Sequence, residues 1–319
     1  MRIRIAGPRG FCAGVDRAIE TVERALAIVG APLYVRHEII HNKTVCEDMV
    51  ARGVVFTDDL NDIPVDSLVV LSAHGCAPDV YALAKARNLQ VLDATCPLVT
   101  KIHLEVRKYI KRGYGIIYIG HHGHVETIGT LGQAPGRVHL VTTTEEAAAL
   151  ADPENLDLIY LTQTTLSIDE TQGIVDVLKT RFPRLQDPPS SDICYATQNR
   201  QDAAKVVCNG ADVCFIIGSQ TSSNSQSLLR VAQSLGVRSF LIDGPDEIMD
   251  EYMHGVHVVA ITGGASAPEA IIQSVVAKIC TFGDASIEEV TVREEHFDFR
   301  VPQSLIALES MVSRRQNKP

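Results

Sequence analysis

Short runs of Val, Ile and Leu recur along the chain, and each is followed by a polar loop and then by a segment with apolar residues every three or four positions. A continuous apolar run is typical of a strand that is buried on both faces of a parallel sheet. The pattern predicts strands over residues 3–6, 67–72, 91–94, 114–120, 138–141, 156–162, 213–218, 239–242 and 257–261. We therefore expect an α/β fold with mostly parallel sheets.

The segments between these strands carry helix signals. Residues 15–29 place their apolar side chains on one helical face, and Gly30 marks the end of that helix. Ser167 and Glu170 have the spacing of a capping box, which predicts the start of a second helix. Asn224, which follows another strand, predicts the start of a third.

The strand and helix units repeat in each third of the chain, which predicts three similar domains. We expect these α/β domains over residues 14–96, 97–193 and 194–281, with residues 1–13 joining the third and residues 282–319 forming a C-terminal extension. Alternating apolar residues over 289–302 predict one or two antiparallel edge strands in the extension. Residues 313–319 are expected to be frayed.

Charge and hydropathy exclude several classes of partner. The net charge of −10, without a long Lys/Arg run, argues against binding to nucleic acid or to an anionic membrane surface. The N-terminus lacks a signal-peptide core, and no apolar run reaches the roughly 18 residues that span a bilayer. We therefore expect a cytoplasmic protein. In that reducing compartment the eight cysteines are expected to be free, metal-bound or catalytic rather than paired.

Three cysteines occupy similar places in the predicted units. Cys12, Cys96 and Cys194 each follow an apolar segment and precede an amphipathic one. A thiol at a helix N-terminus faces unpaired N–H groups and the positive end of the helix dipole, which favours the thiolate. Three equivalent units could bring these thiols to one centre. Spacing alone is a weak metal signal, however, because the chain has no Cys-x-x-Cys pair and all three could be core residues.

Polar residues at the strand ends are further candidates, because ligands of open parallel sheets bind beyond the carboxyl ends of the strands. His41, His74 and His124 lie in such loops, although a lone loop histidine is more often structural or merely exposed. The loops over residues 218–225 and 262–268 could hold phosphate oxygens with N–H and hydroxyl groups, but neither is a Walker loop or a dinucleotide fingerprint. Of the other cysteines, Cys46, Cys208, Cys214 and Cys280 fit inert buried positions, and Cys76 fits a small loop residue.

Taken together, the motifs resemble the 4-hydroxy-3-methylbut-2-enyl diphosphate reductase family. The resemblance runs from about residue 3 to residue 305, and its motifs occur in the family's order. They are Pro-Arg-Gly-Phe-Cys-Ala-Gly-Val-Asp-Arg (8–17), Val-Arg-His-Glu (35–38), His-Asn (41–42), Ser-Ala-His-Gly (72–75), Asp-Ala-Thr-Cys-Pro-Leu-Val-Thr-Lys (93–101), Thr-Gln-Thr-Thr-Leu-Ser (162–167), Asp-Ile-Cys-Tyr-Ala-Thr (192–197), Ser-Ser-Asn-Ser (222–225) and Gly-Ala-Ser-Ala-Pro (264–268).

The resemblance implies three α/β domains around a central 4Fe-4S cluster that is held by Cys12, Cys96 and Cys194. One iron would then lack a cysteine and stay open to substrate. The residues implied to bind the substrate's diphosphate are His41, His74, His124, Ser222, Ser223, Asn224 and Ser266. Glu126 would supply a proton and Thr164 would orient the hydroxyl group, with Thr165 and Thr197 as weaker candidates for the pocket wall.

The implied reaction is a two-electron reductive dehydroxylation that yields isopentenyl and dimethylallyl diphosphate. An external donor such as ferredoxin or flavodoxin is expected, because the sequence has no flavin or nicotinamide motif. In one departure, Val125 stands where the family usually has Pro between this His and Glu. Because proline fixes φ near −65°, its loss is expected to loosen the loop that carries Glu126 without abolishing activity.

Two other readings stay open at this point. A zinc-dependent hydrolase of a diphosphate ester could use His124, Glu126 and a thiolate. A sensor of iron–sulfur clusters or diphosphates could keep the pocket without turnover. Glu126 favours catalysis over sensing, because a sensor has no need of a proton donor at that place.

Overall fold

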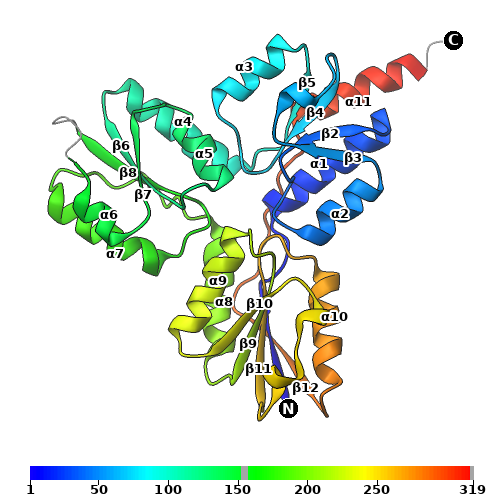
Figure 1. Cartoon of the computed structure of the whole chain (residues 1–319), viewed down its shortest axis with the longest axis vertical. Coiled ribbons are helices and arrows are strands. Elements are labelled where there is room, and N and C mark those ends of the chain that lie inside the picture. Colours follow the sequence, from blue (N-terminus) through cyan, green and yellow to red (C-terminus); the bar gives the residue numbers. More distant parts are fainter. Residues whose placement is uncertain (152–156, 317–319) are drawn as a thin grey trace.

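Three lobes surround a common centre, and each lobe is built on its own parallel sheet (Figure 1). The computed structural model describes residues 1–151 and 157–316. All pairings between named strands in these ranges are parallel. The expected α/β fold with mostly parallel sheets is therefore confirmed.

The first lobe contains a four-stranded sheet in the order β3-β2-β4-β5. Its elements are α1 (Ala13–Val29), β2 (Leu33–Arg36), α2 (Lys43–Ala51), β3 (Val54–Thr57), the 3-10 turn η1 (Leu60–Asp62), β4 (Leu68–Leu71), α3 (Pro78–Ala86) and β5 (Gln90–Asp93). The strands β2 and β3 were not among the predicted ones.

The second lobe contains a three-stranded sheet in the order β7-β6-β8. Its elements are α4 (Pro97–Lys111), β6 (Gly115–Ile119), α5 (Val125–Leu131), β7 (Val138–Val141), α6 (Thr144–Ala149), β8 (Leu158–Thr162) and α7 (Ile168–Arg181). The strand predicted over 156–162 corresponds to β8, and its first position, 156, lies outside the described residues. Ser167 caps α7 by accepting a hydrogen bond from the Glu170 N–H, as its capping-box spacing predicted.

The third lobe contains a five-stranded sheet in the order β10-β9-β11-β1-β12. Its elements are β1 (Arg2–Gly7), α8 (Tyr195–Cys208), β9 (Val213–Ile217), α9 (Ser223–Ser234), β10 (Arg238–Ile242), the 3-10 turns η2 (Pro245–Glu247) and η3 (Asp250–Met253), β11 (Val258–Gly263), α10 (Glu269–Cys280) and β12 (Ser286–Thr291). The first strand thus lies in the same sheet as β9, β10 and β11. The domain bounds given above stay predictions.

The C-terminal segment differs from what the sequence predicted. Antiparallel strands over 289–302 are wrong, because β12 ends at Thr291 and pairs in parallel with β1. Fraying from residue 313 is also wrong for the described part, since helix α11 (Gln303–Gln316) continues through it, while 317–319 lie outside the described residues. Val301 and Leu305 are buried in the core of the first lobe, so the segment returns from the third lobe to the first.

Each sheet is apolar because helices cover both of its faces. In β6 all five residues are buried, and their side chains alternate between two clusters. Ile117 and Ile119 pack into the cluster of α6 and α7, whereas Ile116 and Tyr118 pack into the cluster of α4. Successive side chains of a strand point to opposite faces, so a strand covered twice needs a continuous apolar run.

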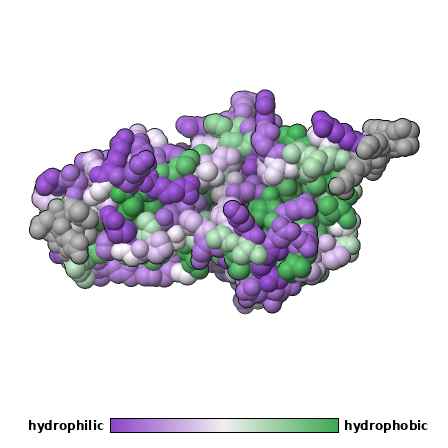
Figure 2. All heavy atoms as spheres, turned by 90° about the horizontal axis from the view of Figure 1, so that it is seen from above, coloured by the Kyte–Doolittle hydropathy of each residue, from purple (hydrophilic) through white to green (hydrophobic). Residues whose placement is uncertain are grey.

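The outer surface is mixed in polarity. The face in Figure 2 intersperses hydrophobic and hydrophilic residues, with many hydrophilic residues over the second lobe. Among the described residues, each helix is too short or too polar to cross a bilayer.

One buried cation fixes a strand-end loop to the start of a long helix. The Arg200 side chain, in α8, is 1% exposed and donates hydrogen bonds to the carbonyl oxygen of Gly10 at 2.8 and 3.0 Å and to that of Phe11 at 3.1 Å. It also pairs with Glu295 at 3.1 Å. These contacts hold the loop between β1 and α1 against the third lobe.

We expect Arg200→Met to lower the free energy of unfolding by about 3–5 kcal/mol, because it leaves a carboxylate and two carbonyl oxygens without their buried donor. Urea unfolding would measure the change. Arg52→Met is the matched control: its pairs with Glu23 and Asp48 are exposed, so its cost should stay below about 1 kcal/mol. If both variants lose the same free energy of unfolding, the buried hydrogen bonds and ion pair of Arg200 add little stability.

Candidate active site

The carboxyl ends of strands from all three lobes meet around one central cavity. The cavity is lined by every residue that the sequence analysis singled out for the site: Cys12, His41, His74, Cys96, His124, Glu126, Thr164, Thr165, Cys194, Thr197, Ser222, Ser223, Asn224 and Ser266. This position matches the general rule that open parallel sheets bind ligands beyond the carboxyl ends of their strands.

The three cysteines each stand at the N-cap of a helix from a different lobe. Cys12 precedes α1, Cys96 precedes α4 and Cys194 precedes α8. The Cys194 sulfur accepts a hydrogen bond from the Thr197 N–H at 3.3 Å and lies 3.0 Å from the Thr197 hydroxyl oxygen. Three chain segments that are far apart in sequence thus direct one thiol each at the same cavity.

Burial, rather than the helix dipole, decides the protonation of these thiols. Burial raises the pKa of Cys96 to about 12 and that of Cys194 to about 11, and it also raises the pKa of Cys12. Backbone N–H groups of the first helical turn lower the pKa of Cys96, but by less than burial raises it. The expectation that the helix N-termini alone favour the thiolate is therefore wrong. A positively charged partner in the cavity would be needed to hold three thiolates.

The spacing of the sulfurs suits a group larger than one ion. Neither the three cysteines nor His124 and Glu126 with a thiolate form a group, among the described residues, whose ligand atoms all lie within 4.8 Å of one another. A single zinc ion with thiolate bonds of about 2.3 Å would bring its sulfurs within about 4.6 Å. A Cβ on Gly14 would lie 2.8 Å from the Cys96 sulfur and 3.8 Å from the Cys12 sulfur, so a side chain there would fill the space beside both. An all-sulfur donor set in an apolar cradle fits an iron–sulfur cluster.

Histidines form the second part of the cavity. The rings of His41 and His74 lie 4.2 Å apart between centroids, and the ring of His124 lies 5.3 Å from that of His41. Burial lowers the pKa of His124 to about 3 and that of His74 well below its usual range, and the neighbouring histidines lower both further. Burial thus favours the neutral form of His74 and His124. An anion placed among them would favour their protonation.

Short neutral donors from the third lobe complete this part. Ser222 caps α9, and its Oγ accepts from the N–H of Ser225. The Ser266 hydroxyl donates to the carbonyl oxygen of His41 at 3.0 Å, which ties the third lobe to the first. Asn224 accepts from the Ala265 N–H at 2.8 Å. The helix after β9 begins at Ser223, close to the start that Asn224 predicted.

Sequence reasoning gave no role to Gln163, although it quoted the motif that contains it. The Gln163 side chain is fully buried, accepts from the His121 N–H at 2.9 Å and donates to the hydroxyls of Thr165 and Ser223 at 3.0 and 3.2 Å. It therefore joins the second lobe to the third at the cavity wall. Its place between two polar residues after a strand was the only signal in the sequence.

Among the described residues, Glu126 is the one acid that lines the cavity, and it lies in the first turn of α5. Its side chain is 3% exposed, and its carboxylate accepts from the N–H and the hydroxyl of Thr164 at 2.8 and 2.9 Å. Burial raises the pKa of Glu126 to about 7, and the hydrogen bonds from Thr164 offset only part of this rise. Such a group can hold and release a proton near neutral pH.

Val125 lies at a helix start, and the looser loop expected there stays a prediction. It is the first residue of α5, where a backbone N–H needs no helical partner, so Val and Pro both fit. The Glu126 N–H donates to Nδ1 of His124 at 3.1 Å and closes the cap.

Comparison with known proteins agrees with these features. A family model described as LytB protein matches residues 3–280. The 4-hydroxy-3-methylbut-2-enyl diphosphate reductase of Bordetella pertussis is 50% identical over 305 residues, which cover 95% of this chain and 93% of that protein. The chain belongs to this family. The predicted resemblance is thereby confirmed, and the chain is a reductase of the LytB family.

Other relatives of the LytB family are similar over the full length. The enzyme of the same name from Haemophilus ducreyi is 47% identical over 96% of this chain and 98% of its own length. The solved structure of the E-1-hydroxy-2-methyl-but-2-enyl-4-diphosphate reductase from Plasmodium falciparum matches with a TM-score of 0.93 at 37% identity, over 99% of both chains. A second solved reductase, described as the terminal enzyme of the non-mevalonate pathway, matches with a TM-score of 0.63 at 29% identity, over 88% of this chain and all of its own.

The raised pKa of Glu126 predicts a stability difference that depends on pH. In the metal-free protein the carboxyl has a pKa of about 7, above its ordinary 4.5, so the folded state holds this proton more tightly than the unfolded state. The resulting stabilisation is fully present below pH 4.5 and is lost as pH rises through about 7. Relative to Glu126→Gln, which cannot ionise, the parent should lose about 3 kcal/mol between pH 4 and pH 8. Urea unfolding of both proteins across this range tests it, and a constant difference would contradict the buried, protonated carboxyl.

Proposed function

We propose that this chain reduces 4-hydroxy-3-methylbut-2-enyl diphosphate to isopentenyl diphosphate and dimethylallyl diphosphate, the last step of the non-mevalonate pathway. The observation that carries the proposal is the meeting, in one cavity, of three cysteines from three lobes, a histidine and hydroxyl cluster, and a buried acid with a pKa of about 7. The names of the full-length relatives support the same substrate.

Cys12, Cys96 and Cys194 would hold a 4Fe-4S cluster in the cavity and leave one iron without a cysteine. When bound, the cluster supplies single electrons and an open iron position that can take a hydroxyl oxygen. The electrons would come from an external donor such as ferredoxin or flavodoxin. Gly14, beside two of the sulfurs, keeps the space that the cluster needs.

The diphosphate would be bound by His41, His74 and His124 from one side and by Ser222, Ser223, Asn224 and Ser266 from the other. The hydroxyl and amide donors of this set are uncharged and can bind phosphate oxygens without repelling one another. The charge of the entering diphosphate would raise the pKa of His74 and His124, which burial lowers, and so add protonated donors. An acidic protein thereby holds a multiply charged anion locally.

Glu126 would protonate the leaving oxygen, and Thr164 would orient it. The Thr164 hydroxyl lies 2.9 Å from a Glu126 carboxylate oxygen, so a substrate hydroxyl beside Thr164 is within reach of the acid. The balanced reaction breaks the allylic C–O bond, consumes two electrons and two protons, and releases water. One proton goes to the oxygen and one to either of two allylic carbons, which gives the two products. Thr197, which is fully buried, and the half-buried Thr165 line the cavity and would help to exclude other water.

Anaerobic purification with iron and sulfide analysis tests the metal centre. We expect about four irons and four sulfides per chain, with one iron distinct in the Mössbauer spectrum and perturbed by the hydroxymethylbutenyl diphosphate. Cys12→Ser, Cys96→Ser and Cys194→Ser should each lose most of the iron, whereas Cys280→Ser, at the end of α10 and outside the cavity lining, should keep it. If the protein contains only zinc, or no metal after anaerobic reconstitution, the proposed iron–sulfur reductase activity is wrong.

The acid role is tested by Glu126→Gln in the cluster-loaded protein. Turnover should fall at least about 100-fold because the proton donor is lost, while added substrate should still perturb the distinct iron. Glu145→Gln, an exposed carboxyl at the start of α6, is the control and should leave turnover unchanged. Unchanged turnover in Glu126→Gln would assign the proton to another group.

A further inference from the structure

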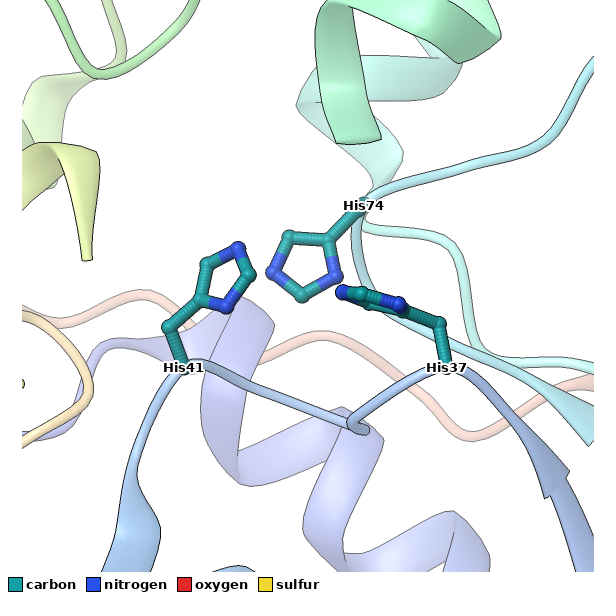
Figure 3. Close-up of side chains that lie close together, drawn as sticks. All are labelled: His37, His41 and His74. Atoms are coloured by element: carbon teal, nitrogen blue, oxygen red, sulfur yellow. The ribbon is translucent and has the colours of Figure 1, made fainter. Parts of the chain in front are cut away.

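Three histidines of the first lobe bring their rings together beside the cavity. One ring nitrogen from each of His37, His41 and His74 lies within 4.8 Å of the other two. Figure 3 shows the ring of His74 between the other two rings, with one of its nitrogens toward His41 and the other toward His37. His37 and His41 come from the loop after β2, and His74 follows β4, its neighbour in the sheet. His37 has no part in the proposed reaction.

Each of these rings is oriented by a second polar group. Nδ1 of His37 lies 2.7 Å from a carboxylate oxygen of Asp58, and Nδ1 of His41 lies 3.2 Å from one of Glu38. Nδ1 of His74 lies 3.2 Å from the Ser72 hydroxyl. A carboxylate that accepts the Nδ1–H fixes the tautomer and leaves Nε2 with a free lone pair, as in most histidines that bind metal.

The free lone pairs are buried and unused. Nε2 of His37 and Nε2 of His41 are inaccessible and have no hydrogen-bond partner in the structure. Leaving buried polar atoms unpaired is costly, so a missing partner at this place is informative. The backbone of His37 adds a second sign of constraint, because its φ of 60° lies in a region that residues other than glycine rarely adopt.

We propose that His37, His41 and His74 form a binding site for one divalent transition-metal ion of the zinc class. Three imidazoles without a carboxylate or thiolate in the set favour Zn²⁺, Co²⁺ or Ni²⁺ over Mg²⁺ and Ca²⁺, which prefer oxygen. Three protein nitrogens leave a fourth position for water or an anion. His37 and His41 also line a neighbouring cleft, together with His121, His122 and Arg230.

Occupancy of this site should compete with the substrate. His41 and His74 cannot bind a metal ion through the same nitrogens that would bind the diphosphate, so the ion and the substrate exclude each other. This consequence rests on the proposed function, whereas metal binding itself does not. Zinc would then act as a reversible inhibitor that binds the enzyme in place of the substrate.

The test uses the cluster-loaded protein, so that the cavity cysteines are already occupied. Equilibrium dialysis against chelator-buffered Zn²⁺ should give one zinc per chain with the iron content unchanged. Zinc X-ray absorption should show nitrogen and oxygen ligands near 2.0–2.1 Å and no sulfur near 2.3 Å. These readouts do not depend on turnover, so they separate failure of the metal site from failure of the proposed reaction.

Two variants remove the site without burdening the fold. His37→Asn keeps a residue that tolerates positive φ, and Asp58→Asn removes an exposed carboxylate. Each should weaken zinc binding at least about tenfold, since loss of a ligand or of its orienting partner commonly costs that much. His122→Asn, an exposed histidine of the neighbouring cleft, is the matched control and should bind as the parent does.

Zinc should also raise the apparent KM of the parent and of His122→Asn, and it should have at least tenfold less effect on His37→Asn. The proposal is overturned if the cluster-loaded parent retains no zinc, if the bound zinc has sulfur ligands, or if His37→Asn binds zinc as tightly as the parent. If zinc binds through histidine but leaves the apparent KM of the parent unchanged, the proposed competition with substrate is wrong.

Discussion

The centre of this protein depends on the hydrogen bonds and the ion pair that the buried guanidinium of Arg200 makes. This side chain lies in α8, whose first turn follows Cys194, and it donates hydrogen bonds to the carbonyl oxygens of Gly10 and Phe11. The loop that carries Cys12 and the helix start that carries Cys194 are therefore fixed to each other. Gln163 and Ser266 add similar links between the second and third lobes and between the third and first. Polar contacts of this kind replace a shared apolar core, which a cavity at the centre cannot have.

The fold was predictable where strands are covered on both faces. A strand such as β6 reads as an unbroken apolar run because each face packs against helices. The strands β2 and β3, which are only partly buried, were not predicted. The strand β12 was predicted with the wrong direction because it is a mostly exposed edge strand, whose alternation does not reveal the direction of its neighbour. The helix α11 was missed because only one side of it, at Leu305, enters a core.

The site was predictable wherever its residues follow strands, since parallel sheets bring those positions together. Burial could not be read from the sequence, and it reverses the expected state of the thiols and sets the pKa of Glu126. The roles of Arg200, Gln163 and His37 were not predicted, because they depend on partners elsewhere in the fold. Arg200 contacts the loop between β1 and α1, Gln163 contacts Ser223 in the third lobe, and Asp58, the partner of His37, follows another strand. A single sequence carries no sign of such pairs.

The protonated state of the three thiols has a consequence for the protein before it acquires metal. Thiols with raised pKa are poor nucleophiles and react slowly with oxidants or with one another, because the thiolate is the reactive form. In a newly folded chain the three thiols should therefore stay reduced and free of disulfides. Insertion of the proposed cluster would displace these protons, so its assembly should become more favourable as the pH rises. Burial would thus protect the three thiols until the cluster is bound.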